Sequence, residues 1–153
     1  MATDTTSGKI KTFCNRLRSY ANDAGTTLND DKVNVYDFFA PVDAPLPHVV
    51  VRLGPSATDP DVGDLREVFE VDAEIIGRAR MDEPRVNAIA DLITQALVSF
   101  RDPATADLGL LAVQSVGRGI LDFIDSPTDD ERIGLTVTAE CFAWPALLTD
   151  ALT

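Results

Sequence analysis

The chain has 153 residues, 45% of them hydrophobic, and a net charge of −12 from 25 acidic and 13 basic side chains. These values suit one folded domain and argue against disorder and against phosphate-neutralising nucleic-acid binding, which needs a basic surface. No run approaches the roughly 20 apolar residues of a membrane helix, and the polar start lacks a secretory signal's apolar core. We therefore expect one domain that folds in the cytoplasm and spans residues 1–153, with a flexible start over 1–8 and a tail over 145–153.

An amphipathic helix is predicted from about Thr6 to Ala24, with Gly25 at the position of a C-cap. Its apolar residues recur at steps of three and four and form one stripe: Ile10, Phe13, Cys14, Leu17, Tyr20, Ala21 and Ala24. Four basic residues lie mostly off this stripe: Lys9, Lys11, Arg16 and Arg18. They give this segment a positive charge, whereas the rest of the chain is acidic. This is the pattern either of a solvated helix face or of a patch for head-to-tail self-association.

Three strands are expected next, over 33–39, 48–53 and 67–79. The first two are separated by a loop over 40–47, because its three prolines cannot donate ladder hydrogen bonds. A polar connection is expected over 54–64. In the third strand apolar residues alternate with the acids Glu70, Asp72 and Glu74, which predicts one core face and one row of carboxylates.

A second helix is predicted to begin after Asp82, an N-cap residue followed by Pro84 in the first turn, and to run to about Phe100. A long hairpin then closes the chain. Its outgoing arm is expected over 110–124 with a bulge or bend at 117–119, and its return arm over 133–144. This order predicts an α+β fold: an antiparallel or mixed sheet with two helices packed on one face and a long C-terminal β-hairpin.

The sequence gives little evidence of a catalytic site. His48, the single histidine, stands at the start of an apolar strand, where a structural role is the usual one. No nucleophile elbow, phosphate loop, dinucleotide fingerprint or C-x-x-C pair is present. Cys14 and Cys141 are too few and too far apart for a disulfide framework and are expected to be part-buried thiols. We therefore expect no enzyme activity and no cofactor.

Metal binding has one near match, the acidic segment from Asp59 to Glu70. A calcium loop needs a ligand at its fifth position and a glycine at its sixth, whereas here Gly63 precedes Asp64. Glu70 also falls in a strand and not at the start of a helix. A solvated acidic loop is the better interpretation, and the same applies to the acids at the predicted hairpin tip: Asp125, Asp129, Asp130 and Glu131. No metal is expected.

Phe142 and Trp144 end the return strand on its polar side. They are interpreted either as a small second core under the tail or as anchors in a subunit contact, where such aromatic residues are enriched. The sequence leaves both interpretations open.

The layout over residues 9–144 resembles that of tail terminator and related tail-completion proteins of long-tailed, siphovirus-like bacteriophages and phage-like gene-transfer particles. The resemblance lies in the order and hydropathy of the elements: the helix Ile10–Ala24, the Pro-rich crossing to His48–Leu53, the acidic strand Glu67–Ile76, the helix Arg85–Leu97 and the hairpin with its Asp-rich tip.

This resemblance implies a virion protein at the head–tail junction. It would form a ring, usually a hexamer, that caps the head-proximal end of the tail tube, stops its polymerisation and joins it to the head connector. Partners would be further copies, the tail tube protein and the head-completion protein. DNA would pass through without specific binding, repelled by acids that line the channel.

The acids that are candidates for lining the channel are Glu70, Asp72, Glu74, Asp125, Asp129 and Asp130. The candidate interface residues are Lys9, Lys11, Arg16, Arg18, Phe142 and Trp144. Two alternatives stay open. One is another neck or minor tail component. The other is a small α+β ligand-binding protein or enzyme, which predicts a pocket of convergent polar groups near His48.

Overall fold

The computed structural model describes residues 6–21, 25–59, 66–99, 111–124 and 131–143. Within these ranges the protein consists of two helices and one six-stranded sheet. In chain order the elements are α1 (Thr6–Ser19), β1 (Asn34–Asp37), β2 (His48–Asp59), β3 (Arg66–Arg78), α2 (Glu83–Ser99), β4 (Leu111–Arg118), β5 (Asp122–Ile124) and β6 (Arg132–Ala143).

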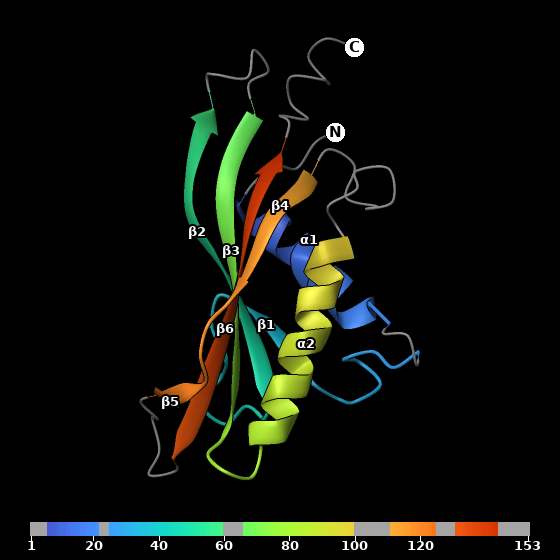
Figure 1. Ribbon diagram of the computed structural model, residues 1–153, viewed down its shortest axis with the longest axis vertical. Helices are drawn as coiled ribbons and strands as arrows, with labels where there is room; N and C mark the ends of the chain where they lie inside the picture. The colour runs from blue at the N-terminus through green and yellow to red at the C-terminus, as the bar shows by residue number, and fades with distance from the viewer. Residues whose placement is uncertain (1–5, 22–24, 60–65, 100–110, 125–130, 144–153) are drawn as a thin grey trace.

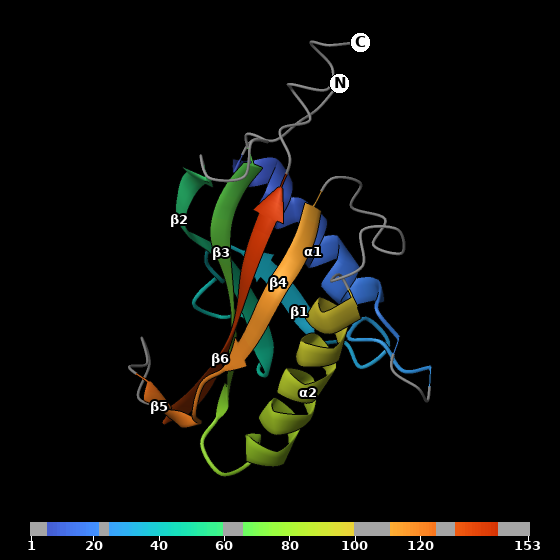
Figure 2. The ribbon, with the colours of Figure 1, turned by 45° about the horizontal axis from the view of Figure 1, so that its top comes forward.

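The sheet is mixed, with the strand order β1-β2-β3-β6-β4, and β5 pairs with β6 beyond the end of β4. β1 runs parallel to β2, and every other pair is antiparallel. Both helices lie on one side of the sheet, and the opposite, helix-free side carries none of the helices that the structure describes (Figures 1 and 2). The predicted α+β fold with two helices on one face of a mixed sheet is confirmed.

The core fills the space between the helices and the sheet. Alternate residues of the central strands are almost fully buried there, including Val49, Val51, Val71, Ala73 and Ile75. Because side chains alternate across a strand, the residues between them point to the helix-free side. The larger buried side chains contributed by α1 are Phe13 and Leu17.

α2 begins as predicted at the turn that follows β3. The backbone oxygen of Asp82 accepts the hydrogen bond from the Val86 amide at 2.7 Å, which closes the first turn. The Asp82 carboxylate turns back to β3 and accepts hydrogen bonds from the backbone amide and Nε of Arg78, at 2.8 and 3.1 Å. The turn is thereby tied both to the strand before it and to the helix after it.

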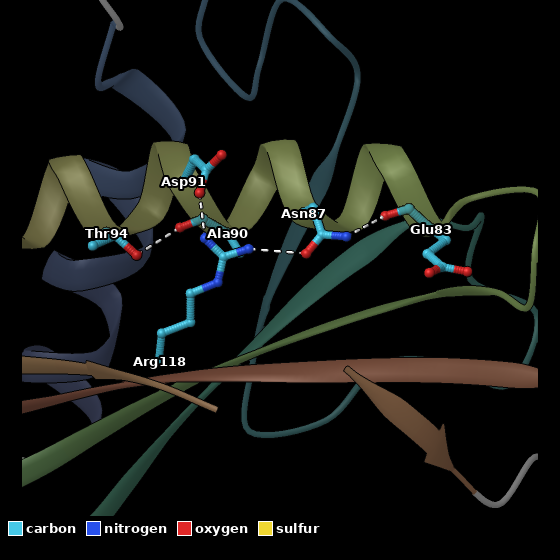
Figure 3. A network of polar contacts seen from close by, with 6 residues as sticks. All are labelled: Glu83, Asn87, Ala90, Asp91, Thr94 and Arg118. Carbon is cyan, nitrogen blue, oxygen red and sulfur yellow. Dashed lines mark hydrogen bonds and ion pairs between the residues drawn. The ribbon is translucent and has the colours of Figure 1, made fainter. Parts of the chain in front are cut away.

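A polar network attaches the exposed side of α2 to β4 (Figure 3). Arg118, from the end of β4, pairs with Asp91 and donates from Nη2 to Asn87 Oδ1 at 2.9 Å. Asn87 in turn donates to the backbone oxygen of Glu83, one turn earlier, at 3.1 Å.

α1 ends at Ser19, five residues before the predicted end, and this part of the prediction was wrong. The last turn closes with a hydrogen bond from the Tyr20 amide to the Arg16 oxygen. The following segment folds back on the helix, where the Asn29 amide donates to the Arg18 oxygen and Leu28 is buried in the core. Gly25 has a φ of 80°, but it lies beyond the helix and does not cap it.

β2 is longer than predicted and continues through residues 54–59, which were expected to form part of a polar connection. The pairing with β3 shifts between Leu53 and Ser56 and then resumes to the pair Asp59–Arg66. Pro55 falls inside this irregularity, where its missing N–H breaks no ladder hydrogen bond. The rest of the predicted connection, 60–64, lies outside the described residues.

The closing hairpin is confirmed, with one correction. β4 and β5 both pair with β6, and the chain bends between them as predicted. The Gly119 amide donates to the Thr136 oxygen at 2.8 Å, and a Cβ on Gly119 would come within 3.1 Å of that oxygen. The shift in register, however, lies between Val113 and Ser115, before the predicted position.

Candidate functional site

The helix-free face of the sheet carries the predicted carboxylate row of β3. Glu70 is exposed, whereas Asp72 and Glu74 are partly buried. Their positions relative to the core are as predicted, because the intervening residues of β3 face the helices.

The environment of the row changes along the strand. Glu74 forms an ion pair with Arg52 of β2 at 3.2 Å, and Asp72 accepts a hydrogen bond from Thr138 Oγ1 of β6 at 2.9 Å. Glu70, in contrast, lies directly opposite Glu140 of β6, so two like charges meet at that end. The negative charge of this face is therefore concentrated at the Glu70–Glu140 end.

A hollow of about 320 Å³ lies at the opposite end of the same face. Between the loop after β1, the start of β2 and strand β5, it is lined by Phe39, Ala40, Pro41, Val42, His48, Val50, Arg52, Glu74, Ile76, Ile124 and Arg132. Arg132 and Glu140 are eight positions apart on β6, a distance of about 26 Å at the usual rise of a strand.

Arg132 is the most unusual group in the hollow. It begins β6 on the helix-free side, opposite Arg78 in register. Its side chain is buried, with 9% of the residue exposed, and its Nε has no hydrogen-bond partner. Sequence reasoning did not single this residue out. Its place in the alternation of β6 indicates the face, but its burial depends on the loop after β1 and on β5.

His48 is 2% exposed at the base of the hollow. Its Nδ1 lies 3.1 Å from the Pro45 oxygen, and Tyr36 packs edge-on with its ring centroid 5.5 Å away. Because a carbonyl oxygen only accepts, Nδ1 carries the hydrogen. Burial lowers the pKa of His48 and the nearby Arg132 lowers it further, against the opposing effects of the Pro45 hydrogen bond and Glu74.

Large apolar side chains are exposed around this end of the molecule, and the sequence analysis did not predict them. The exposed fractions are 76% for Phe39, 62% for Val42, 67% for Phe123 and 83% for Ile120. Phe39 and Val42 also line the hollow. These residues stand in the loop after β1 and in the segment around β5, where no helical or strand periodicity shows whether a side chain is exposed.

The basic residues of α1 divide into different environments. Lys11 is exposed. Arg18 is partly buried and donates from Nη2 to the backbone oxygen of Val35 and from Nη1 to Asn15 Oδ1 at 3.0 Å. Arg18 therefore anchors α1 to the edge strand β1. The interface role of Lys9, Lys11, Arg16 and Arg18 stays a prediction.

Several other predicted site residues receive no test. Asp125, Asp129, Asp130 and Trp144 lie outside the described residues. The backbone of Phe142 belongs to β6 and pairs with Val68 and Ala112.

Both cysteines are free, as predicted, and are buried more completely than the part-buried thiols that the sequence led us to expect. Burial raises the pKa of Cys14 to about 11 and that of Cys141 to about 12, so neither is activated as a nucleophile.

In the part of the chain that the structure describes, no cluster of three or more His, Cys, Asp or Glu is placed to hold a metal ion. Asp59 ends β2 and Glu70 lies within β3, whereas the middle of the near-match calcium loop falls outside that part. None of the described helices has the length and apolar character needed to cross a membrane.

No family model and no curated protein matches this chain. Among solved structures, a chain of the "Virion of native gene transfer agent (GTA) particle" is similar, with 20% sequence identity and a TM-score of 0.50. The similarity covers 92% of this chain and 100% of that chain. At this level of identity the likeness shows a shared fold, extending over nearly all of both chains.

Proposed function

We propose that this chain is a structural protein of a phage-like virion. In this proposal it forms a homo-oligomeric ring, with about six copies, at the head-proximal end of the tail tube. The ring stops tube polymerisation and joins the tail to the head connector. The protein acts by binding its neighbours, without catalysis, cofactor or metal.

The observation that supports this proposal most is the likeness to a chain of a gene transfer agent virion, which covers all of that chain. The layout of elements also resembles that of tail terminator proteins. The two findings come from different sources, since one compares folded backbones and the other the order and hydropathy of sequence elements.

The charge of the helix-free face fits a ring through which DNA passes. Glu70 and Glu140 are exposed on this face. Carboxylates that line a channel repel phosphates and keep DNA from binding to the wall. We propose that this end of the face, with Asp72 and Glu74 beside it, is directed to the channel.

The test compares particles assembled with and without this chain by electron microscopy. Without a terminator, we expect tails longer than normal and detached from heads, with normal lengths restored when the chain is supplied again. Tails of normal length that fail to join heads would assign the chain to another neck component. Normal infectious particles would contradict a virion role.

The hollow near His48 supports a second candidate, a small ligand-binding protein. It meets the geometric expectation of that alternative, because His48, Arg52, Glu74 and Arg132 converge on one cavity. This candidate predicts a compact monomer or dimer that ignores tail tube protein. Light scattering of the purified chain at low and moderate salt, alone and with tube protein, separates the two functions.

A further inference from the structure

The guanidinium of Arg132 is a buried cation that forms no ion pair with any of the described residues. It is more than nine-tenths buried, and its Nε has no hydrogen-bond partner among them. Burying a charge is costly unless it is paired and hydrogen-bonded. The described residues of one copy therefore leave the buried guanidinium without an anionic partner.

The other groups of the hollow do not supply the missing charge. Glu74 is paired with Arg52, whose Nε also donates to the backbone oxygen of Phe38 at 3.0 Å. His48 is buried, and burial and Arg132 both lower its pKa, so it is neutral near pH 7. Among the described residues of the hollow, the guanidinium is consequently left open to an anion from another molecule.

We propose that the hollow at Arg132 is a binding site for a carboxylate side chain of a second copy of this chain. A guanidinium binds a carboxylate through two parallel hydrogen bonds, and the pairing is strong where water is excluded. The proposal deepens the proposed function, because it names a contact through which copies join in a ring.

The apolar rim favours a protein as the source of the carboxylate. Phe39 and Val42 are largely exposed at the edge of the hollow, and Phe123 and Ile120 are exposed on the segment around β5. A free small anion leaves these side chains in water, whereas a protein surface covers them. A buried polar contact with an apolar surround is a frequent arrangement in subunit interfaces.

The distribution of charge favours a second copy. The chain carries 25 acidic against 13 basic side chains, so each copy offers carboxylates beyond the proposed channel acids that have no basic partner of their own. A contact between the hollow of one copy and an acidic surface elsewhere on the next copy joins two different surfaces. Repetition of such a head-to-tail contact closes a ring when the rotation between copies permits it.

The test measures the mass of the purified full chain by light scattering over a range of concentrations, for wild type and three variants. Arg132→Met removes the charge with similar bulk, Arg132→Lys retains it, and Arg80→Gln removes an exposed arginine at the same end of the molecule as a control. We expect wild type to self-associate, Arg132→Met to do so roughly 30-fold more weakly or worse, and Arg80→Gln to match wild type. Arg132→Lys should fall between wild type and Arg132→Met.

Thermal unfolding separates lost binding from lost folding. Replacing a buried, unpaired charge by an apolar side chain is neutral or stabilising in the isolated chain. We expect Arg132→Met to melt no lower than wild type at concentrations where both are monomers. Sodium glutamate at the ionic strength of the chloride buffer should dissociate wild-type oligomers by competing for Arg132.

Three results would overturn the proposal. The first is a wild-type chain that stays a monomer at every concentration. The second is an Arg132→Met variant that associates as strongly as wild type. The third is a wild-type chain that does not associate but whose melting temperature rises with glutamate, while that of Arg132→Met does not. The last result would assign the hollow to a free carboxylate. If particles made with Arg132→Met have capped tails joined to heads, this contact is wrong although the proposed function stands.

Discussion

Polar side chains that are buried or partly buried in this protein find their hydrogen-bond partners in loops and sheet edges that come close to them only on folding. Arg18 donates to the oxygen of Val35 at the edge of the sheet, and His48 lies against the Pro45 oxygen of the loop before β2. Each group has a partner from an adjacent segment. Arg132, whose Nε has none, stands out by comparison.

His48 predicts a dependence of stability on pH. Because burial lowers its pKa below the ordinary 6.5, the unfolded chain takes up a proton first as the pH falls. The contribution of neutral His48 to the free energy of unfolding is therefore fully present above about pH 6.5 and decreases below it. Urea unfolding of wild type and His48→Asn at pH 7.5 and 5.5 measures this contribution.

We expect wild type to lose more stability than His48→Asn between the two pH values. Asparagine can donate its amide to the Pro45 oxygen but cannot take up a proton. An equal loss in both proteins would show that other groups, and not His48, produce the pH dependence.

At the scale of elements, the contact between β3 and the start of α2 is tight enough to exclude any side chain at Gly77. A Cβ there would lie 2.7 Å from Cγ2 of Val86 and 2.8 Å from Cβ of Asp82. Both neighbours are buried and belong to the first turn of α2 or its cap. We expect Gly77→Ala to displace that turn and to destabilise the protein by about 1–3 kcal/mol, as overpacking usually does.

Chemical denaturation of Gly77→Ala and of Gly117→Ala measures this effect. Gly117 is a matched control in β4, because a Cβ there would meet nothing within 4 Å. A loss of stability as large in the control would point to backbone flexibility, and not to packing against α2, as the cause.

At the scale of the whole molecule, a net charge of −12 on 153 residues opposes the compact state. Among the described strand residues, Glu74 is paired with Arg52, whereas Glu70 faces Glu140. We expect the melting temperature of the monomer to rise by a few degrees between about 10 and 150 mM salt, since the Debye length falls to about 8 Å. Differential scanning calorimetry checks this, and a melting temperature that falls with salt would show that ion pairs such as Arg52–Glu74 dominate.

The described helices both lie on one face of the sheet, so the other face is left without a helix among the described residues (Figure 1). Acids concentrate at one end of the open face, and a buried arginine with apolar neighbours lies at the other. Such a surface is suited to assembly with further chains, in agreement with the proposed function.

The sequence by itself determined the type and order of the main elements. Alternation placed the carboxylates of β3 opposite the core, and the three- and four-residue spacing in α1 gave the stripe that includes the buried Phe13, Cys14 and Leu17, because these periods follow directly from backbone geometry. The start of α2 at Asp82 and the two-part outgoing arm of the hairpin could also be predicted, because both depend on residues that are close together in the sequence.

Tertiary structure alone decided where α1 ends, how far β2 extends and what surrounds Arg132. α1 ends early because the packing of Leu28 and the Asn29–Arg18 hydrogen bond favour a turn over further helix. β2 continues past Pro55 because β3 offers it a partner across an irregularity. The Arg132 hollow joins segments separated by more than 80 residues, and no local pattern records which distant segments will cover a side chain.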